Sequence, residues 1–100
     1  MKTTKSYQEE LIKSLKDPEE ATAYINAALE ENDLPEVFLL ALKNVAEAYG
    51  FSRLAKKTHL NRENLYRMLS EKGNPELSSL KSLLNGLGLR LHVEPRKKVA

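Results

Sequence analysis

The segment that decides the fold runs from Phe51 to Ser70 and reads FSRLAKKTHLNRENLYRMLS. Its pattern predicts two short helices joined by a tight turn, the arrangement of a helix-turn-helix. Small or apolar residues occupy the positions that should face inward: Leu54, Ala55, Thr58, Leu60, Leu65 and Met68. Ala55 suits a close crossing of the two helices. Asn61 is placed to accept a hydrogen bond from the free N–H groups that open the second helix.

The second predicted helix should present a polar and cationic face to solvent. On such a face Arg suits guanine, Glu suits cytosine and Asn suits adenine, while Tyr suits a thymine methyl group or a phosphate. Polar residues at the start of the first helix should hold the DNA backbone instead. The candidate DNA-binding residues are Ser52, Arg53, Asn61, Arg62, Glu63, Asn64, Tyr66 and Arg67.

An ordinary solvated face is the alternative, with Glu63 and Arg67 paired at i, i+4. The segment 51–72 carries six Lys or Arg residues against two Glu, and this excess of cations favours contact with DNA. Tyr66 by itself suits a protein interface as well. A structural role is expected for His59 in the predicted turn, because histidine tolerates left-handed backbone better than most residues.

Four further helices are predicted from hydrophobic spacing and end signals, over residues 7–15, 18–31, 35–49 and 77–87. The inward stripe of the second of these comprises Ala21, Tyr24, Ile25, Ala28 and Leu29. The run 37–42 is apolar on most sides, so the third should be nearly buried at the centre of the domain. Asn32 and Asp33 should end the helix over residues 18–31. Gly86 and Gly88 should end the last helix.

The last predicted element is a strand at Leu89–Glu94, where apolar residues alternate with Arg90, His92 and Glu94. The rest of the chain offers no second strand, and a lone strand leaves a row of unpaired N–H and C=O groups. Pairing with the same strand of a second copy across a two-fold axis solves this. We therefore expect a homodimer formed through Leu89–Glu94.

The predicted architecture is all-α, with five or six helices and a short C-terminal β-strand. The length of 100 residues suits one domain. It should span residues 1–100, with residues 1–6 and 96–100 as flexible tails.

Composition excludes several classes of protein. The chain has no cysteine, which excludes disulfides and thiolate metal sites and suits a reducing cytosol. No apolar run is long enough for a membrane span and no signal peptide is recognisable, so a cytoplasmic protein is expected. His59 and His92 lack the neighbours of a triad or a metal site, and no phosphate-cradling glycine loop is present. The expectation is a protein that is not an enzyme and binds no cofactor or metal.

Charge is distributed unevenly along the chain. Residues 1–50 hold five Lys and ten Asp or Glu, for a net charge of −5. Residues 51–100 hold eleven Lys or Arg and four Glu, for a net charge of +7. This asymmetry fits two partners, one anionic and one cationic, although solvated helix faces can also differ by chance.

Residues 17–95 resemble the HigA-like antidote proteins of bacterial addiction modules, within the lambda-repressor/Cro class of helix-turn-helix proteins. The matching segments are DPEEATAYINAALEEND, PEVFLLALKNVAEAYG, FSRLAKKTHLNRENLYRMLSEKGNPEL and LKSLLNGLGLRLHVEP. The chain departs from the family pattern at Thr58, where an aliphatic residue is usual, and at His59, where a turn glycine is usual.

The resemblance implies an antitoxin that neutralises a RelE/HigB-like ribonuclease toxin and represses its own promoter by binding a palindromic operator. A ribonuclease toxin must be basic to hold RNA, so acidic residues of the first half are candidates to face it: Glu19, Glu20, Glu30, Glu31, Asp33 and Glu36. Two alternatives stay open. One is a stand-alone prophage-type repressor without a toxin, and the other is a protein-interaction module that has lost DNA binding.

Overall fold

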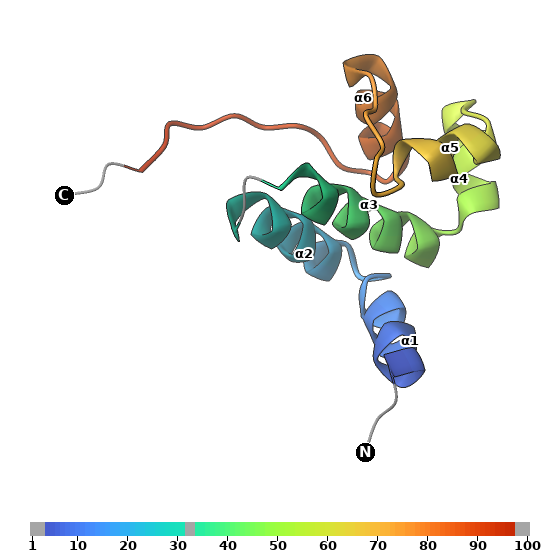
Figure 1. The fold of residues 1–100 in the computed structure, drawn as a ribbon, viewed down its shortest axis with the longest axis horizontal. Coiled ribbons are helices and arrows are strands. Elements are labelled where there is room, and N and C mark those ends of the chain that lie inside the picture. The colour runs from blue at the N-terminus through green and yellow to red at the C-terminus, as the bar shows by residue number, and fades with distance from the viewer. Residues whose placement is uncertain (1–3, 32–33, 98–100) are drawn as a thin grey trace.

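The computed structural model describes residues 4–31 and 34–97, except for the side chain of Glu31, and these residues form six α-helices arranged about the long helix α3, which is one of the six (Figure 1). The helices are α1 (Thr4–Ser14), α2 (Pro18–Glu31), α3 (Pro35–Tyr49), α4 (Phe51–Thr58), α5 (Arg62–Met68) and α6 (Leu77–Gly86). Helices α1, α2 and α4 pack on α3, and α4 in turn packs on α5 and α6. The all-α prediction is confirmed.

Local end signals explain where α2 and α3 begin and end. The Asp17 carboxylate accepts a hydrogen bond of 3.0 Å from the backbone N–H of Glu19, and Pro18 follows as the first helical residue. At the other junction Gly50 adopts φ 107° between α3 and α4, a backbone conformation that glycine reaches without strain. Helices α2 and α3 therefore have the predicted bounds.

Helix α1 begins earlier than predicted, at Thr4. Residues 4–6 of the expected N-terminal tail are thus helical. Residues 1–3 and 98–100, the outer parts of the two expected tails, lie outside the described residues, as do Asn32 and Asp33 of the expected break.

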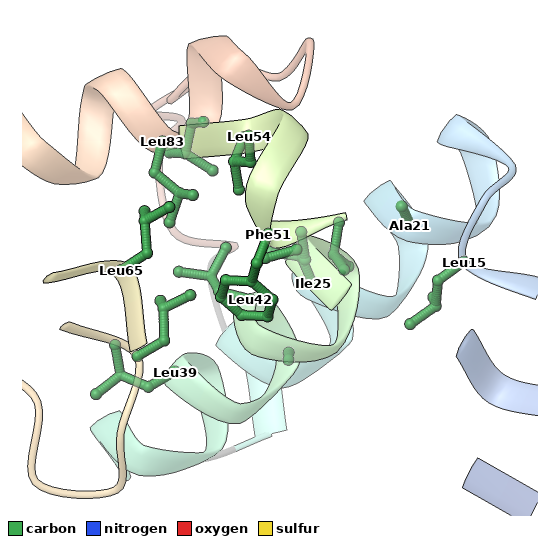
Figure 2. Close-up of a cluster of buried hydrophobic side chains, with 14 residues drawn as sticks. Leu15, Ala21, Ile25, Leu39, Leu42, Phe51, Leu54, Leu65 and Leu83 are labelled. Atoms are coloured by element: carbon green, nitrogen blue, oxygen red, sulfur yellow. The ribbon is translucent and has the colours of Figure 1, made fainter. Parts of the chain in front are cut away.

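The core lies between α3 and the helices of the second half. Its most completely buried side chains are those of Leu42, Leu54, Leu65, Leu69 and Leu83. Figure 2 shows Phe51 beside Leu42 at the centre, with Ile25, Ala21 and Leu15 extending the cluster toward α2 and the end of α1. One apolar cluster thus holds both halves of the chain together.

Two predictions of burial are wrong. Leu40 is 55% exposed, although the run 37–42 was expected to be nearly buried, and Leu29 is 52% exposed despite its place in the inward stripe of α2. Helix α3 packs chiefly through the face that carries Leu39, Leu42 and Val45. Hydrophobic spacing identifies a stripe, but the neighbouring helices decide how much of that stripe is covered.

A buried amide joins the first three helices. Asn44 of α3 is 5% exposed. Its Oδ1 accepts a hydrogen bond of 3.0 Å from Nε2 of Gln8 in α1, and its Nδ2 donates one of 2.9 Å to the hydroxyl of Tyr24 in α2. Both ends of the buried amide are thereby satisfied, as burial of a polar group requires.

The predicted strand at Leu89–Glu94 is not formed in the single chain. Gly88 adopts φ 78° after α6, and the backbone N–H of Leu89 donates to the carbonyl of Leu84 at 2.8 Å. The chain then leaves the helices as an open segment, drawn in red-orange in Figure 1. We call residues 89–97 the C-terminal arm. A strand requires a ladder of hydrogen bonds to a neighbour, and the described helices offer the arm no sheet edge.

Candidate nucleic-acid interface

Helices α4 and α5 are joined by a three-residue turn that local hydrogen bonds define closely. His59 adopts φ 62°, which confirms its expected structural role in the turn. The Asn61 side chain accepts a hydrogen bond of 2.7 Å from the backbone N–H of Glu63, so the predicted cap of α5 is also confirmed. The direction of α5 relative to α4 is therefore set by the backbone of the turn.

Thr58 contributes a further restraint through its hydroxyl. Its Oγ1 donates to the carbonyl of Leu54 at 2.8 Å and accepts from the backbone N–H of Leu60 at 3.2 Å. One hydroxyl thus connects the last turn of α4 to the residue that leads into α5. An aliphatic side chain at this position would make neither bond.

All eight predicted site residues are exposed on the α4–α5 pair. Ser52 and Arg53 lie in the first turn of α4, Asn61 caps α5, and the remaining five lie on α5 itself. Leu65 is fully buried and anchors the inner side of helix α5 in the hydrophobic core. The arrangement leaves one short helix with a buried apolar side and an exposed polar side.

Tyr66 is held by an aromatic contact that sequence reasoning missed. Its ring stacks on that of Phe51, with centroids 4.2 Å apart and planes inclined by 13°. Phe51 is buried, whereas Tyr66 remains 41% exposed. The two aromatic residues were visible in the sequence, but their contact depends on how α5 crosses the start of α4. The stack restricts the orientation of the Tyr66 ring within the chain itself.

The guanidinium of Arg62 lies beside the same ring. Its Cζ is 5.7 Å from the Tyr66 centroid, and its Nη2 is 3.5 Å from the Tyr66 hydroxyl. The first of these distances falls within the range of a cation–π interaction, while the second is long for a hydrogen bond. Arg62 is thus loosely supported by Tyr66 at the start of α5.

A second cluster, also missed from the sequence, flanks the first helix of the pair. Cζ of Arg53 lies 4.2 Å from the ring centroid of Tyr49, and Nζ of Lys57 lies 5.5 Å from it. The two cations are one helical turn apart on α4, so both reach the tyrosine at the end of α3. We call Tyr49, Arg53 and Lys57 the tyrosine–cation cluster. The sequence did contain a signal for this cluster, because Arg53 and Lys57 follow Tyr49 at intervals of four residues.

The surroundings of the site differ in charge from the other end of the molecule. Helices α4 and α5 carry Arg53, Lys56, Lys57, Arg62 and Arg67 against the single acid Glu63. Helix α2 carries four Glu residues and no Lys or Arg. Both regions pack on α3 but lie on different sides of it (Figure 1). The cationic surface is thus separated from the acidic helix by the central helix.

The side chains of this site offer hydrogen-bond donors, acceptors and cations, the groups that recognise phosphates and base edges. Two other features are absent from the described part of the chain. Within residues 4–31 and 34–97, no three His, Asp or Glu side chains are grouped so that they could hold a metal ion. None of the described helices is both long and apolar enough to cross a membrane.

Comparisons relate the chain to known proteins over most of its length. A family model described as "Probable addiction module antidote protein" matches residues 5–95. The chain is also similar to an uncharacterized protein of Haemophilus influenzae, with 32% identity over 85 residues that cover 85% of this chain and 87% of that protein. No solved structure matches the chain.

Proposed function

The chain belongs to the family of probable addiction module antidote proteins, and from this premise we propose that it is an antitoxin that also represses its own promoter. Its partners are a cognate toxin and a palindromic operator in double-stranded DNA, and it acts in the cytoplasm without enzymatic activity. We further propose that it is of the HigA-like kind, with α4 and α5 as a lambda-repressor/Cro-type helix-turn-helix. The toxin is a RelE/HigB-like ribonuclease.

The polar outer side of α5 is the observation that supports DNA binding best. Arg62, Asn64 and Arg67 are exposed there, while Leu65 between them is buried and fixes the helix on the core. In this proposal α5 enters the major groove and its side chains contact base edges. Ser52, Arg53 and Lys57 on the preceding helix α4 then hold the phosphates, with Tyr49 at the end of α3 beside the two cations.

The acidic helix α2 supports the proposal of a protein partner. Glu19, Glu20 and Glu30 are exposed on it, and Glu36 is exposed at the start of α3. Two further acids that the sequence suggests for this role, Asp33 and the side chain of Glu31, lie outside the described residues. A ribonuclease needs basic groups to hold RNA, so an acidic surface is the complement it would meet in an inhibitor.

Palindromic operators are read by two-fold symmetric proteins. We therefore keep the homodimer through Leu89–Glu94 as part of the proposed function. Two copies of α5 would then read half-sites about one DNA turn, ~34 Å, apart.

A gel-shift experiment tests the DNA-binding proposal. Arg62→Ala combined with Arg67→Ala should abolish retention of the protein's own promoter fragment, because both cations leave the exposed side of α5. The matched control is Lys13→Ala with Lys16→Ala, which removes two exposed cations at the end of α1 and beyond it. Equal retention by both double variants would show that the chain does not use α5 to bind DNA.

Co-purification tests the antitoxin proposal separately. The chain should copurify with the small protein encoded beside its gene. Glu19→Lys, Glu20→Lys and Glu30→Lys combined should release that protein while the gel shift persists. If no neighbouring protein is retained by the unaltered chain, the stand-alone repressor is favoured instead.

A further inference from the structure

The C-terminal arm leaves the domain with its backbone largely unpaired. The N–H of Leu89 is bonded to the carbonyl of Leu84. Among the described residues, no backbone–backbone hydrogen bond involves positions 90–97. These N–H and C=O groups are available to a strand from outside the chain.

The side chains of the arm are also unprotected. Leu91 is 48% exposed and Val93 is 92% exposed, so apolar surface of the arm stands in water. The polar residues Arg90, His92 and Glu94 alternate with them. In a strand, such alternation would place the apolar residues on one face and the polar residues on the other.

We propose that two arms pair antiparallel about a two-fold axis at His92, so that Arg90 of each copy lies opposite Glu94 of the other. This inference rests on the proposed homodimer and specifies its interface. In this register Leu91 of each copy lies opposite Val93 of the other, and the two His92 residues face each other at the axis. The polar faces of the two arms then carry two cross-strand pairs of opposite charge, an arrangement that stabilises a sheet.

Other registers of the two arms fit the charges less well. An axis at Leu91 would place Arg90 opposite His92, and an axis at Val93 would place Arg90 opposite Arg96. An axis between two residues would oppose the polar side chains of one arm to the apolar side chains of the other, because directly opposite residues share a face. Only the axis at His92 keeps both faces uniform and opposes each Arg90 to an acid.

The hydrogen-bonding capacity of the arm is compatible with this register and shows which of its pairs would bond. An antiparallel ladder alternates between pairs that exchange both N–H···O bonds and pairs that exchange none. Leu89 lies opposite Pro95 in the proposed register. The Leu89 N–H is already bonded to Leu84, and Pro95 has no N–H, so this pair must be of the second kind. Because the two kinds of pair alternate, the hydrogen-bonded pairs are then Arg90 with Glu94 and His92 with His92. Each of these residues has the backbone N–H that such a pair requires.

Space for a second arm exists beside the first. A groove of about 640 Å³ runs between the arm and helix α2, and its walls include Ile25, Leu29 and Phe38 as well as Leu91. The exposed leucines at positions 29 and 91 therefore border the same groove. A second arm laid along the first would add apolar surface next to both.

Charge reversal of the full-length chain tests the register. Arg90→Glu places Glu opposite Glu94, and Glu94→Arg places Arg opposite Arg90, so each single variant should dimerise about ten- to a hundredfold more weakly. The double variant R90E/E94R restores two opposite-charge pairs and should dimerise like the unaltered chain. An equimolar mixture of the two single variants should form heterodimers for the same reason. Molar mass is measured by light scattering over a range of protein concentrations, and circular dichroism checks that helix content is unchanged.

The outcomes separate this inference from the proposed function. Single variants that dimerise as tightly as the unaltered chain would overturn the arm–arm interface and leave a dimer formed elsewhere. Weakened single variants without restoration in the double variant would overturn the register. A single chain's mass for the unaltered protein at micromolar concentration would instead overturn the homodimer on which the inference rests.

Discussion

Gly86 and Gly88 stand two positions apart and serve different purposes. Both were expected to end the last helix, yet Gly86 is still helical and buried in α6. A Cβ at this position would collide with Cγ2 of Thr58 and the side chain of Leu54. At Gly88 a Cβ would meet nothing within 4 Å, and its φ of 78° is the reason for glycine. Gly86 thus allows α6 to approach α4, and Gly88 turns the chain into the arm.

Replacing Gly86 by alanine should destabilise the domain despite the better helix propensity of alanine. Overpacking a tight contact costs about 1–3 kcal/mol, whereas the gain in propensity is at most ~1 kcal/mol. Urea denaturation measures the difference. Adding Thr58→Ser removes the colliding methyl group and keeps the hydroxyl bonds, so it should recover part of the loss. A fully stable Gly86→Ala variant would show that α4 and α6 can separate at no cost.

Asn61 combines a structural role with a proposed role in DNA contact, and two substitutions separate them. Asn61→Ala should destabilise the domain by about 1 kcal/mol, because the N–H of Glu63 loses its acceptor. Asn61→Ser keeps a neutral cap, so its midpoint in urea should stay near that of the unaltered chain. If the serine variant nevertheless retains less promoter DNA in a gel shift, the Asn61 amide contacts the operator. Equal retention would leave Asn61 as a cap only.

At the scale of elements, the helices with strong end signals were the most predictable. Asp17 and Pro18 mark the start of α2, and Pro35 and Gly50 bound α3, because each acts on the backbone of its own immediate segment. The stack of Phe51 on Tyr66 and the contact of Arg53 with Tyr49 depend on how two helices cross. Spacing within one helix does not contain that information. The candidate site was therefore predictable as a set of exposed residues, but not as two aromatic clusters.

The C-terminal arm shows a different limit. The alternation at Leu89–Glu94 is a property of the sequence, whereas a strand is a property of two segments that bond to each other. The pattern predicted a strand, and the single chain has an open arm because it provides no neighbour. The same pattern specifies a register once a second copy is considered.

Helix α1 should be the least stable of the helices. None of its own residues is buried, and one of its links to α3 is the hydrogen bond from Gln8 to Asn44. Gln8→Ala should therefore speed amide hydrogen exchange in α1 and leave the rest of the domain nearly unchanged, because local opening reports local contacts. Lys13→Ala on the same helix is the control. Faster exchange throughout the domain would mean that the Asn44 network supports the whole core.

For the molecule as a whole, the separation of charge by α3 bears on how two partners could be bound. Five exposed cations lie on α4 and α5, and the acidic α2 lies on another side of α3 (Figure 1). The proposed DNA and toxin surfaces therefore do not overlap. On the proposed function, operator and toxin would therefore bind different surfaces of one chain.

The contribution of the tyrosine–cation cluster should be visible in the salt dependence of DNA affinity. Removing one cation that binds a phosphate lowers the slope of log affinity against log salt concentration by about 1. Lys57→Ala should reduce the magnitude of the slope by roughly that amount per bound chain, and should weaken binding to unrelated DNA equally. Fluorescence anisotropy at several salt concentrations measures it, with Lys13→Ala as the control. An unchanged slope would place Lys57 away from the DNA backbone.

The open arm also has a consequence for the lifetime of the protein. Exposed segments without secondary structure are the preferred sites of proteolytic cleavage, and Arg90 lies in such a segment, outside the helical core. Cleavage after Arg90 would remove residues 91–100 and leave all six helices intact. The product would keep its fold and lose the segment proposed to join two copies. Pairing of the arms would hide this bond from a protease, so the fraction of protein that is unpaired would set the rate at which it is degraded.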